Sequence, residues 1–215
     1  MRRSPGRPAH DTDRFIATAL QIIDDDGAEA LSMRSLAQRL NSSTATLYRH
    51  FPNRAALIAE VIDRVLGEVA LGVGDLRAGT WQQACQRLAH AIFNALERHR
   101  NVALLLADHP PHGPNAALVR ECWLAVLLDN GFPPPLAARS AAMMARYVLG
   151  FAIQIGTQRS TAAADEAQYR TALQSLDPIR FPATAAAARA LPVSLDDEFG
   201  FGLELILGGL TRLRD

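Results

Sequence analysis

Apolar residues recur along most of the chain at intervals of three and four positions, which is the spacing of an amphipathic helix. A clear stripe near the start consists of Phe15, Ile16, Ala19, Leu20 and Ile23. Alternation at every second position, which would indicate strands, is nearly absent. The pattern therefore predicts an all-α fold.

Four helices are expected in the first third of the chain, over about residues 11–26, 33–40, 44–50 and 53–73. Ser32 can cap the second helix and Asn53 the fourth, because their side-chain oxygens accept hydrogen bonds from the N–H groups that a helix start leaves unpaired. A three-residue turn, 41–43, separates the two short helices. The first helix ends at Gly27 behind the run Asp24-Asp25-Asp26. Acids there oppose the helix dipole, and the pattern supplies no reason for them.

A larger helical segment is expected after the break at Gly72, Gly74 and Gly79. Its helices are predicted over about residues 80–98, 101–107, 114–129, 134–157 and 194–213. Between the last two, a mobile connection is expected at 159–166, followed by one or two short helices that Pro178 and Pro182 interrupt.

Composition indicates a globular chain: 49% of the 215 residues are hydrophobic and 20% are charged. All 22 basic residues are arginine and 22 acids balance them, so any contact with nucleic acid must be local. The N-terminus lacks the apolar stretch of a signal peptide, and no window approaches ~18 uninterrupted apolar residues. We therefore expect a cytoplasmic protein with no membrane partner.

Basic charge is concentrated in one segment. No acid occurs between Glu29 and Glu60, whereas that stretch holds four arginines, a local charge of +4, and the first ten residues add three more. Such a local field attracts phosphates. A solvated basic face would carry the same charge, so charge alone leaves both interpretations open.

The two short helices and their turn, braced by a longer helix, match the helix-turn-helix arrangement. The second helix is small and polar enough on its outer face to enter a major groove, where hydroxyls bond base edges and methyls meet thymine. Its outer side chains are Thr44, Ala45, Thr46, Tyr48, Arg49 and His50, and Arg34 can reach guanine from the start of the preceding helix. Core packing with a solvated hydroxyl is the alternative for Tyr48.

The residues around this turn resemble the DNA-binding domain of the tetracycline-repressor (TetR) family. The resemblance is carried by Leu31–Ala37, by Asn41–Phe51 with its Thr-Leu-Tyr-x-His core, and by Asn53–Leu57. It implies a homodimeric bacterial transcription regulator, usually a repressor released from double-stranded operator DNA by a small molecule. The family's DNA contacts fall here on Arg34, Thr44, Ala45, Thr46, Tyr48, His50 and Arg54.

The second half resembles the C-terminal domain of the tetracycline-repressor class, at Trp81-Gln82, His99-Arg100, Gly131-Phe132, Phe201–Ile206 and Gly209-Leu210. The resemblance implies that the 134–157 helix and the last helix form a four-helix dimer interface. Glycines inside the last helix cost ~1 kcal/mol each relative to alanine, which close approach of another backbone would offset. An ordinary buried helix is the alternative.

We therefore divide the chain into a flexible basic arm (1–10), a helix-turn-helix DNA-binding domain (11–52), a linking helix (53–73) and an effector-binding and dimerisation domain (74–215). The family's drug and magnesium positions fall on Ala70, Leu88, Ile92, Leu106, His109 and Trp123. Because nearly all are apolar, we expect no tetracycline–magnesium recognition, no metal and no cofactor.

An apolar cavity for a largely hydrophobic effector of unknown identity is expected instead. Its candidate lining is Leu88, Ile92, Leu105, His109, Trp123, Leu127, Met144, Tyr147 and Phe151, with His109 and Gln154 as polar handles. Ordinary core packing would show the same helical spacing, so it stays open for each of these residues.

Enzyme chemistry has little support in the sequence. The histidine pairs at 90/99 and 109/112 lack metal-binding spacing. Cys85 has no preorganised histidine partner, and both Cys85 and Cys122 fit small buried hydrophobes. The alternative functions are a helical small-molecule-binding protein or enzyme whose N-terminal domain does not read DNA, and a structural interaction module. Neither needs the acid-free segment.

Overall fold

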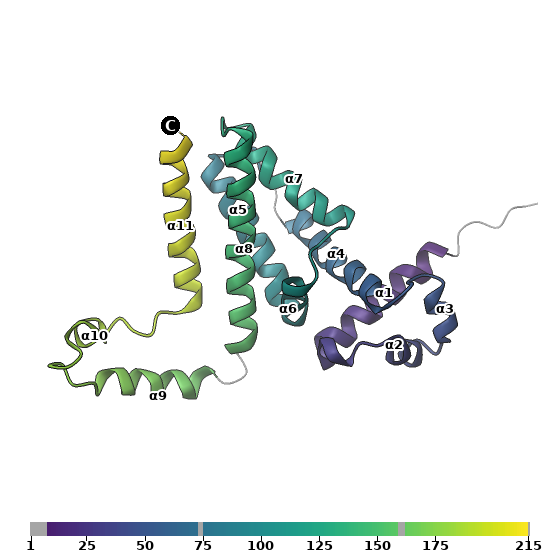
Figure 1. Cartoon of the computed structure of the whole chain (residues 1–215), viewed down its shortest axis with the longest axis horizontal. Coiled ribbons are helices and arrows are strands. Elements are labelled where there is room, and N and C mark those ends of the chain that lie inside the picture. Colours follow the sequence, from purple (N-terminus) through teal and green to yellow (C-terminus); the bar gives the residue numbers. More distant parts are fainter. Residues whose placement is uncertain (1–7, 73–74, 159–161, 215) are drawn as a thin grey trace, which may run out of the picture. The chain divides into compact units, whose positions relative to one another are not determined.

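The computed structural model describes residues 8–72, 75–158 and 162–214 (Figure 1). These residues form helices throughout, with no strand among them, which confirms the all-α prediction. The elements are α1 (Pro8–Asp26), the short 3-10 helix η1 (Ala28–Ala30), α2 (Met33–Arg39), α3 (Thr44–Tyr48), α4 (Arg54–Gly72), α5 (Trp81–Arg98), α6 (Arg100–Asp108), α7 (Pro114–Leu128), α8 (Pro134–Gln158), α9 (Ala162–Gln174), α10 (Pro182–Ala187) and α11 (Leu195–Arg214).

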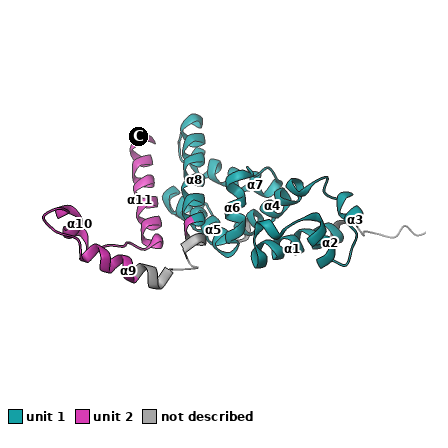
Figure 2. Cartoon of the chain, turned by 60° about the horizontal axis from the view of Figure 1, so that its bottom comes forward, with its two compact units in different colours: residues 1–153 teal, residues 154–215 magenta. Residues whose placement is uncertain are grey.

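The chain divides into two compact units, residues 1–153 and 154–215, with the boundary inside α8 (Figure 2). Within the first unit, α1, α2 and α3 gather at one end, and α4 runs from them to the helices at the other end (Figure 1). Helix α4 packs against α1, α5, α6 and α7. It is therefore the element that joins the two ends of this unit.

The end that holds the short helices has a continuous apolar core. The stripe predicted for α1 is buried, and Leu36 of α2, Leu47 of α3 and Phe51 are buried as well. Three side chains cap helices as their types favour: Ser32 accepts from the Ser35 N–H at 3.0 Å, Ser43 from Thr46 at 3.2 Å, and Asn53 from Ala56 at 2.8 Å. The predicted caps of α2 and α4 are thus confirmed.

A buried carboxylate ties α4 to α7. Asp63, on α4, is only 5% exposed, and it accepts hydrogen bonds from the N–H groups of Asn115 at 3.3 Å and Ala116 at 2.9 Å. The Asn115 side chain adds a third, at 3.0 Å. Gly113 precedes α7 and offers no capping side chain. Asp63 therefore caps α7 from a different helix, where a negative charge also complements the helix dipole.

The helices α5 to α8 complete the first unit. Thr80 and Gln83 form a reciprocal cap at the start of α5, and the Trp81 ring packs edge-on against Phe132 with centroids 4.9 Å apart. In α8, Pro134–Gln154 is long and apolar enough to cross a membrane by length and composition alone, a test that core helices of soluble proteins also pass. Arg139 and Arg146 lie within this stretch. Length and composition do not decide whether the helix meets a membrane, so the expected absence of a membrane partner stays a prediction.

Two boundaries differ from the predictions. Helix α1 begins at Pro8 rather than near Asp11, because proline suits the first turn of a helix, where its missing N–H costs nothing. Helix α9 begins at Ala162, inside the segment predicted as a connection, whose alanines are strong helix formers. Residues 1–7 of the predicted arm lie outside the described residues.

Candidate nucleic-acid interface and effector cavity

Helix α3 presents its polar side chains to solvent. Thr44, Ala45, Tyr48 and Arg49 are exposed, and Leu47 alone in this helix is buried. The Tyr48 ring is 53% exposed, so it is not a core residue in this structure. Thr46 is half-buried, and its hydroxyl lies 3.0 Å from the Ser43 hydroxyl. The short side chains needed in a major groove are thus on the outer surface of the helix.

The turn before α3 and the start of α2 extend this surface. Arg34 is exposed in the first turn of α2. Asn41 takes a left-handed conformation (φ 49°), which asparagine tolerates better than most residues, and this closes the turn between the helices. Arg39 instead pairs with Asp26 at 2.9 Å. Within the part of the chain that the structure describes, Arg34 makes no such ion pair.

His50 lies between the candidate interface and α1. Its Nδ1 lies 3.0 Å from the Thr12 hydroxyl, and its ring packs edge-on against Phe15 with centroids 5.1 Å apart. These contacts fix the ring plane, so any contact with a phosphate involves the remaining nitrogen, Nε2.

Arg54 is placed differently from the other predicted contacts. Its Nε donates to the carbonyl of Leu31 at 2.7 Å and its Nη2 to that of Ala28 at 2.6 Å. The guanidinium therefore ties α4 to the segment between α1 and α2. Sequence reasoning missed this role because the partners lie 23 and 26 residues away along the chain.

We expect Arg54→Ala to lower the free energy of unfolding by about 2 kcal/mol, because two partly buried carbonyls lose charged donors. Urea unfolding measures the change. Arg49→Ala, which removes an exposed arginine nearby, should stay within about 0.5 kcal/mol of the parent. Equal stability of both variants would contradict this role for Arg54.

The predicted effector residues lie mostly inside the core. Leu88, Ile92, Leu105, Trp123, Leu127 and Met144 are buried on α5, α6, α7 and α8. Tyr147 and Phe151 are half-buried, with ring centroids 5.0 Å apart, and Nδ1 of His109 lies 3.2 Å from the carbonyl of Leu105. Helix α5 packs against both α6 and α7, which brings its candidates near theirs.

Two polar atoms in this core have no hydrogen-bond partner within the described residues: Nε1 of Trp123 and the hydroxyl oxygen of Ser140. Both side chains are almost completely buried. Leaving a buried polar group unpaired costs roughly 1–3 kcal/mol, so these two atoms are candidates for a contact with a bound molecule or an ordered water. No pattern in the sequence marks Ser140, which lies in an alanine-rich stretch.

Two hollows are lined by residues that sequence reasoning did not select. A cavity of about 350 Å³ lies between the segment before α5 and helix α7, and Trp81, Glu121 and Cys122 are among its lining. An open groove runs along α5 beside Gln83, Arg87 and His90. Cys85 is fully buried, and burial raises the pKa of its thiol to about 12, as expected for a packing residue rather than a nucleophile.

Comparison with known proteins identifies the architecture. Residues 15–61 match the model of bacterial regulatory proteins of the tetR family, and residues 73–214 match the tetracyclin repressor-like C-terminal domain. The second match alone covers more than half of the chain. The chain belongs to the TetR family. It is thus a DNA-binding transcriptional repressor of the ligand-responsive kind and not an enzyme.

TetR-family relatives match along nearly the whole chain. The transcriptional repressor DrrR1 of Streptomyces coeruleorubidus is 31% identical, over 98% of this chain and 82% of its own. The class G tetracycline repressor of Vibrio anguillarum is 26% identical, over 95% of each. The crystal structure of the TetR-family protein ActR of Streptomyces coelicolor with actinorhodin is 32% identical, covers 98% of this chain and 99% of that one, and superposes with a TM-score of 0.85.

Proposed function

We propose that this TetR-family protein acts as a cytoplasmic homodimer that reads operator DNA with α3 and the start of α2, and that a largely apolar effector releases it. The observation that carries the DNA-reading part is the outward-facing polar surface of α3 in a segment without acids. The proposed contacts are Arg34, Thr44, Ala45, Thr46, Tyr48, Arg49 and His50, with Arg54 acting mainly by holding α4 in place.

The division of labour follows the sequence: residues 11–52 read DNA, 53–73 link, and 74–215 bind the effector and dimerise. In a twofold dimer the two copies of α3 would meet half-sites about one helical turn apart, or a multiple of that. Effector binding would favour one separation of the two copies of α3 over another, and α4 would transmit this change from the effector-binding domain to α3.

The effector we infer is mostly apolar and carries a hydrogen-bond acceptor. Trp123 is almost completely buried, and its indole N–H can only donate a hydrogen bond. A carbonyl or phenolate oxygen of a ligand would pair it. The solved complex of ActR with actinorhodin makes actinorhodin a reasonable first probe.

Selection from random duplex DNA tests the DNA-reading part of this proposal. The full-length protein should enrich a sequence with twofold symmetry, and actinorhodin, with other apolar aromatic compounds, is then screened for release of that duplex. Enrichment without symmetry would contradict the dimeric reading mode. No enrichment, combined with tight binding of a compound, would favour a small-molecule-binding protein that does not read DNA.

Among single substitutions, Arg34→Ala should weaken binding to the selected duplex by about 1–3 kcal/mol and relax the preference at one base position. A bidentate guanidinium–guanine contact would be lost. Thr46→Ala should likewise lower affinity. Arg64→Ala removes the same charge from an exposed site of α4 outside the acid-free segment and serves as the matched control. Unchanged affinity for both Arg34→Ala and Thr46→Ala would reject this reading surface.

A further inference from the structure

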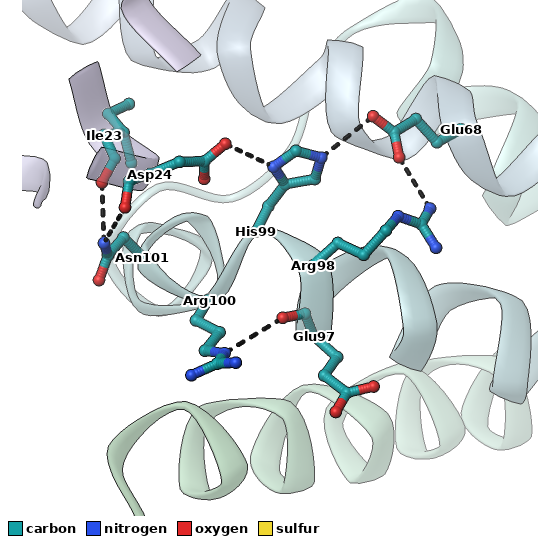
Figure 3. A network of polar contacts seen from close by, with 8 residues as sticks. All are labelled: Ile23, Asp24, Glu68, Glu97, Arg98, His99, Arg100 and Asn101. Carbon is teal, nitrogen blue, oxygen red and sulfur yellow. Dashed lines mark hydrogen bonds and ion pairs between the residues drawn. The ribbon is translucent and has the colours of Figure 1, made fainter. Parts of the chain in front are cut away.

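His99 lies at the junction of α5 and α6 and contacts two further helices, α1 and α4. It follows the last residue of α5 and precedes the first of α6, and its ring reaches between two carboxylates (Figure 3). Nδ1 lies 2.8 Å from Oδ2 of Asp24, in the last turn of α1, and Nε2 lies 3.1 Å from Oε1 of Glu68, on α4. The side chain is mostly buried. One imidazole thus bridges the helix that braces the α2–α3 pair and the helix that links both ends of the unit.

The partners favour one protonation state of the ring. Ionised carboxylates only accept hydrogen bonds, so satisfying both requires two donating ring nitrogens, which an imidazole provides only as the imidazolium cation. A neutral ring would turn a lone pair toward one of the carboxylates. Asp24 would then lose its hydrogen bond from the ring, and its other oxygen, Oδ1, is buried with no hydrogen-bond partner in the described part of the chain.

The neighbouring charges come from all the helices around the ring. On α4, Glu68 also receives a hydrogen bond from Arg98 at 2.8 Å. Burial by itself would raise the pKa of Glu68, but the bond from Arg98 and the charge of His99 outweigh it and hold the pKa below its usual value. The charged residues next to these groups in the sequence are Asp25, Asp26, Glu97 and Arg100. Asp26 pairs with Arg39, and Nε of Arg100 donates to the carbonyl of Glu97 (Figure 3).

We propose that His99 is a positioning residue, which in its cationic form clamps α1 and α4 to the α5–α6 junction. The Asn101 side chain on α6 also donates to the carbonyl of Ile23 at 2.8 Å, so one part of the hold on the DNA-reading end depends on a proton and another part does not (Figure 3). The clamp also accounts for the acidic run at the end of α1. Asp24 pairs with His99 and Asp26 pairs with Arg39. For two of the three acids, these contacts offset the unfavourable interaction with the helix dipole.

The clamp needs charge on both of its members. It is complete only while both ring nitrogens of His99 carry protons and Glu68 is ionised, and loss of a ring proton removes one donor. In acid it loses Glu68 instead, once the pH falls through the lowered pKa of that carboxyl. The attachment of α1 and α4 to the α5–α6 junction is therefore strongest while both charges are present.

Imidazole NMR of the full chain labelled with 15N-histidine tests the protonation state directly. His99→Gln identifies the resonances of His99 by their loss. Near neutral pH, both nitrogens of His99 should show protonated shifts. A ring with a single proton at that pH would overturn the proposal, whatever the protein does with DNA.

The second test replaces the charge but keeps the bridge. In Asp24→Asn, the amide N–H can donate to Nδ1 of a neutral ring while Nε2 still donates to Glu68, so this variant should hold the clamp at high pH. In His99→Gln, one carboxylate lacks a donor at every pH. In the parent, the midpoint temperature of thermal unfolding of the full chain should fall as the pH rises. In both variants this temperature should depend less on pH. At high pH, Asp24→Asn should be the more stable of the two variants.

The functional readout is affinity for the selected duplex across the same pH range. Across this pH range, the affinity of the parent for the duplex should change about fivefold more than the affinity of either variant. The affinities of the two variants should agree within about twofold. His50 is present in all three proteins, so its own titration cancels in the comparison. Coincident profiles for the parent and His99→Gln would overturn the proposal. If no duplex is selected, the proposed function fails, while the NMR and unfolding results still decide the clamp.

Discussion

Replacement of Asp63 by alanine should lower the free energy of unfolding by about 3 kcal/mol. The carboxylate is buried and accepts three hydrogen bonds, two of them from N–H groups in the first turn of α7. Those groups would be left unpaired inside the protein, with no side chain at Gly113 to replace the cap. Urea unfolding of the full chain measures the loss, and Asp63→Asn, which keeps the shape but gives up an acceptor, should fall between alanine and the parent.

Gly113→Ala tests the Asp63 cap from the α7 side and should lower the free energy of unfolding. A Cβ at this position would overlap the Asp63 carboxyl group and displace it from α7. The backbone of Gly113 has φ −73°, which any residue adopts, so the cost is steric rather than conformational. Gly150→Ala is the matched control, because nothing lies within 4 Å of its added methyl and the helix there should gain up to ~1 kcal/mol. Comparable stability of the two variants would refute the cap.

The two ends of this contact show how far the sequence could lead. Periodicity and capping are local signals, so they predicted the buried stripe of α1 and the caps at Ser32 and Asn53. Asp63 caps a helix 52 and 53 residues away in sequence, and no local pattern announces such a partner. A polar residue in the apolar run of α4 reads as an exposed position until α7 is placed against it.

The candidate sites divide in the same way. The outward face of α3 was predictable, because its exposure follows from the burial of Leu47 on the opposite side of a short helix. The internal bonds of Arg54 and the bridge at His99 were not, because each joins elements distant in the chain. The effector cavity was only partly predictable. Helical spacing selects buried residues, yet it does not separate those that line a ligand from those that pack a core.

Helix α11 carries an apolar surface that the single chain leaves uncovered. Phe201, Leu205 and Leu213 are 66%, 60% and 67% exposed. Together with Gly209 they recur at intervals of four and form one stripe, while Phe199, Leu203, Leu207 and Leu210 are buried on the other side. Among the described residues, nothing lies within 4 Å of a Cβ built at Gly208 or Gly209, so no packing contact in that part of the chain requires glycine there. A second copy packed closely against this stripe would use both features.

We therefore expect Phe201→Glu to convert the proposed dimer into a monomer, because a charge in an apolar contact would have to be buried without a partner. Light scattering should give about half the mass of the parent. Affinity for the selected duplex should fall about a hundredfold or more, since a monomer meets one half-site and loses the gain from paired binding. Arg189→Glu places the same side chain at an exposed site outside α11 and should leave the mass unchanged. A parent protein that is already monomeric at micromolar concentration would reject α11 as the dimer contact. A Phe201→Glu variant of unchanged mass would do the same, because a charge in the middle of the apolar stripe would then leave the association of the two chains intact.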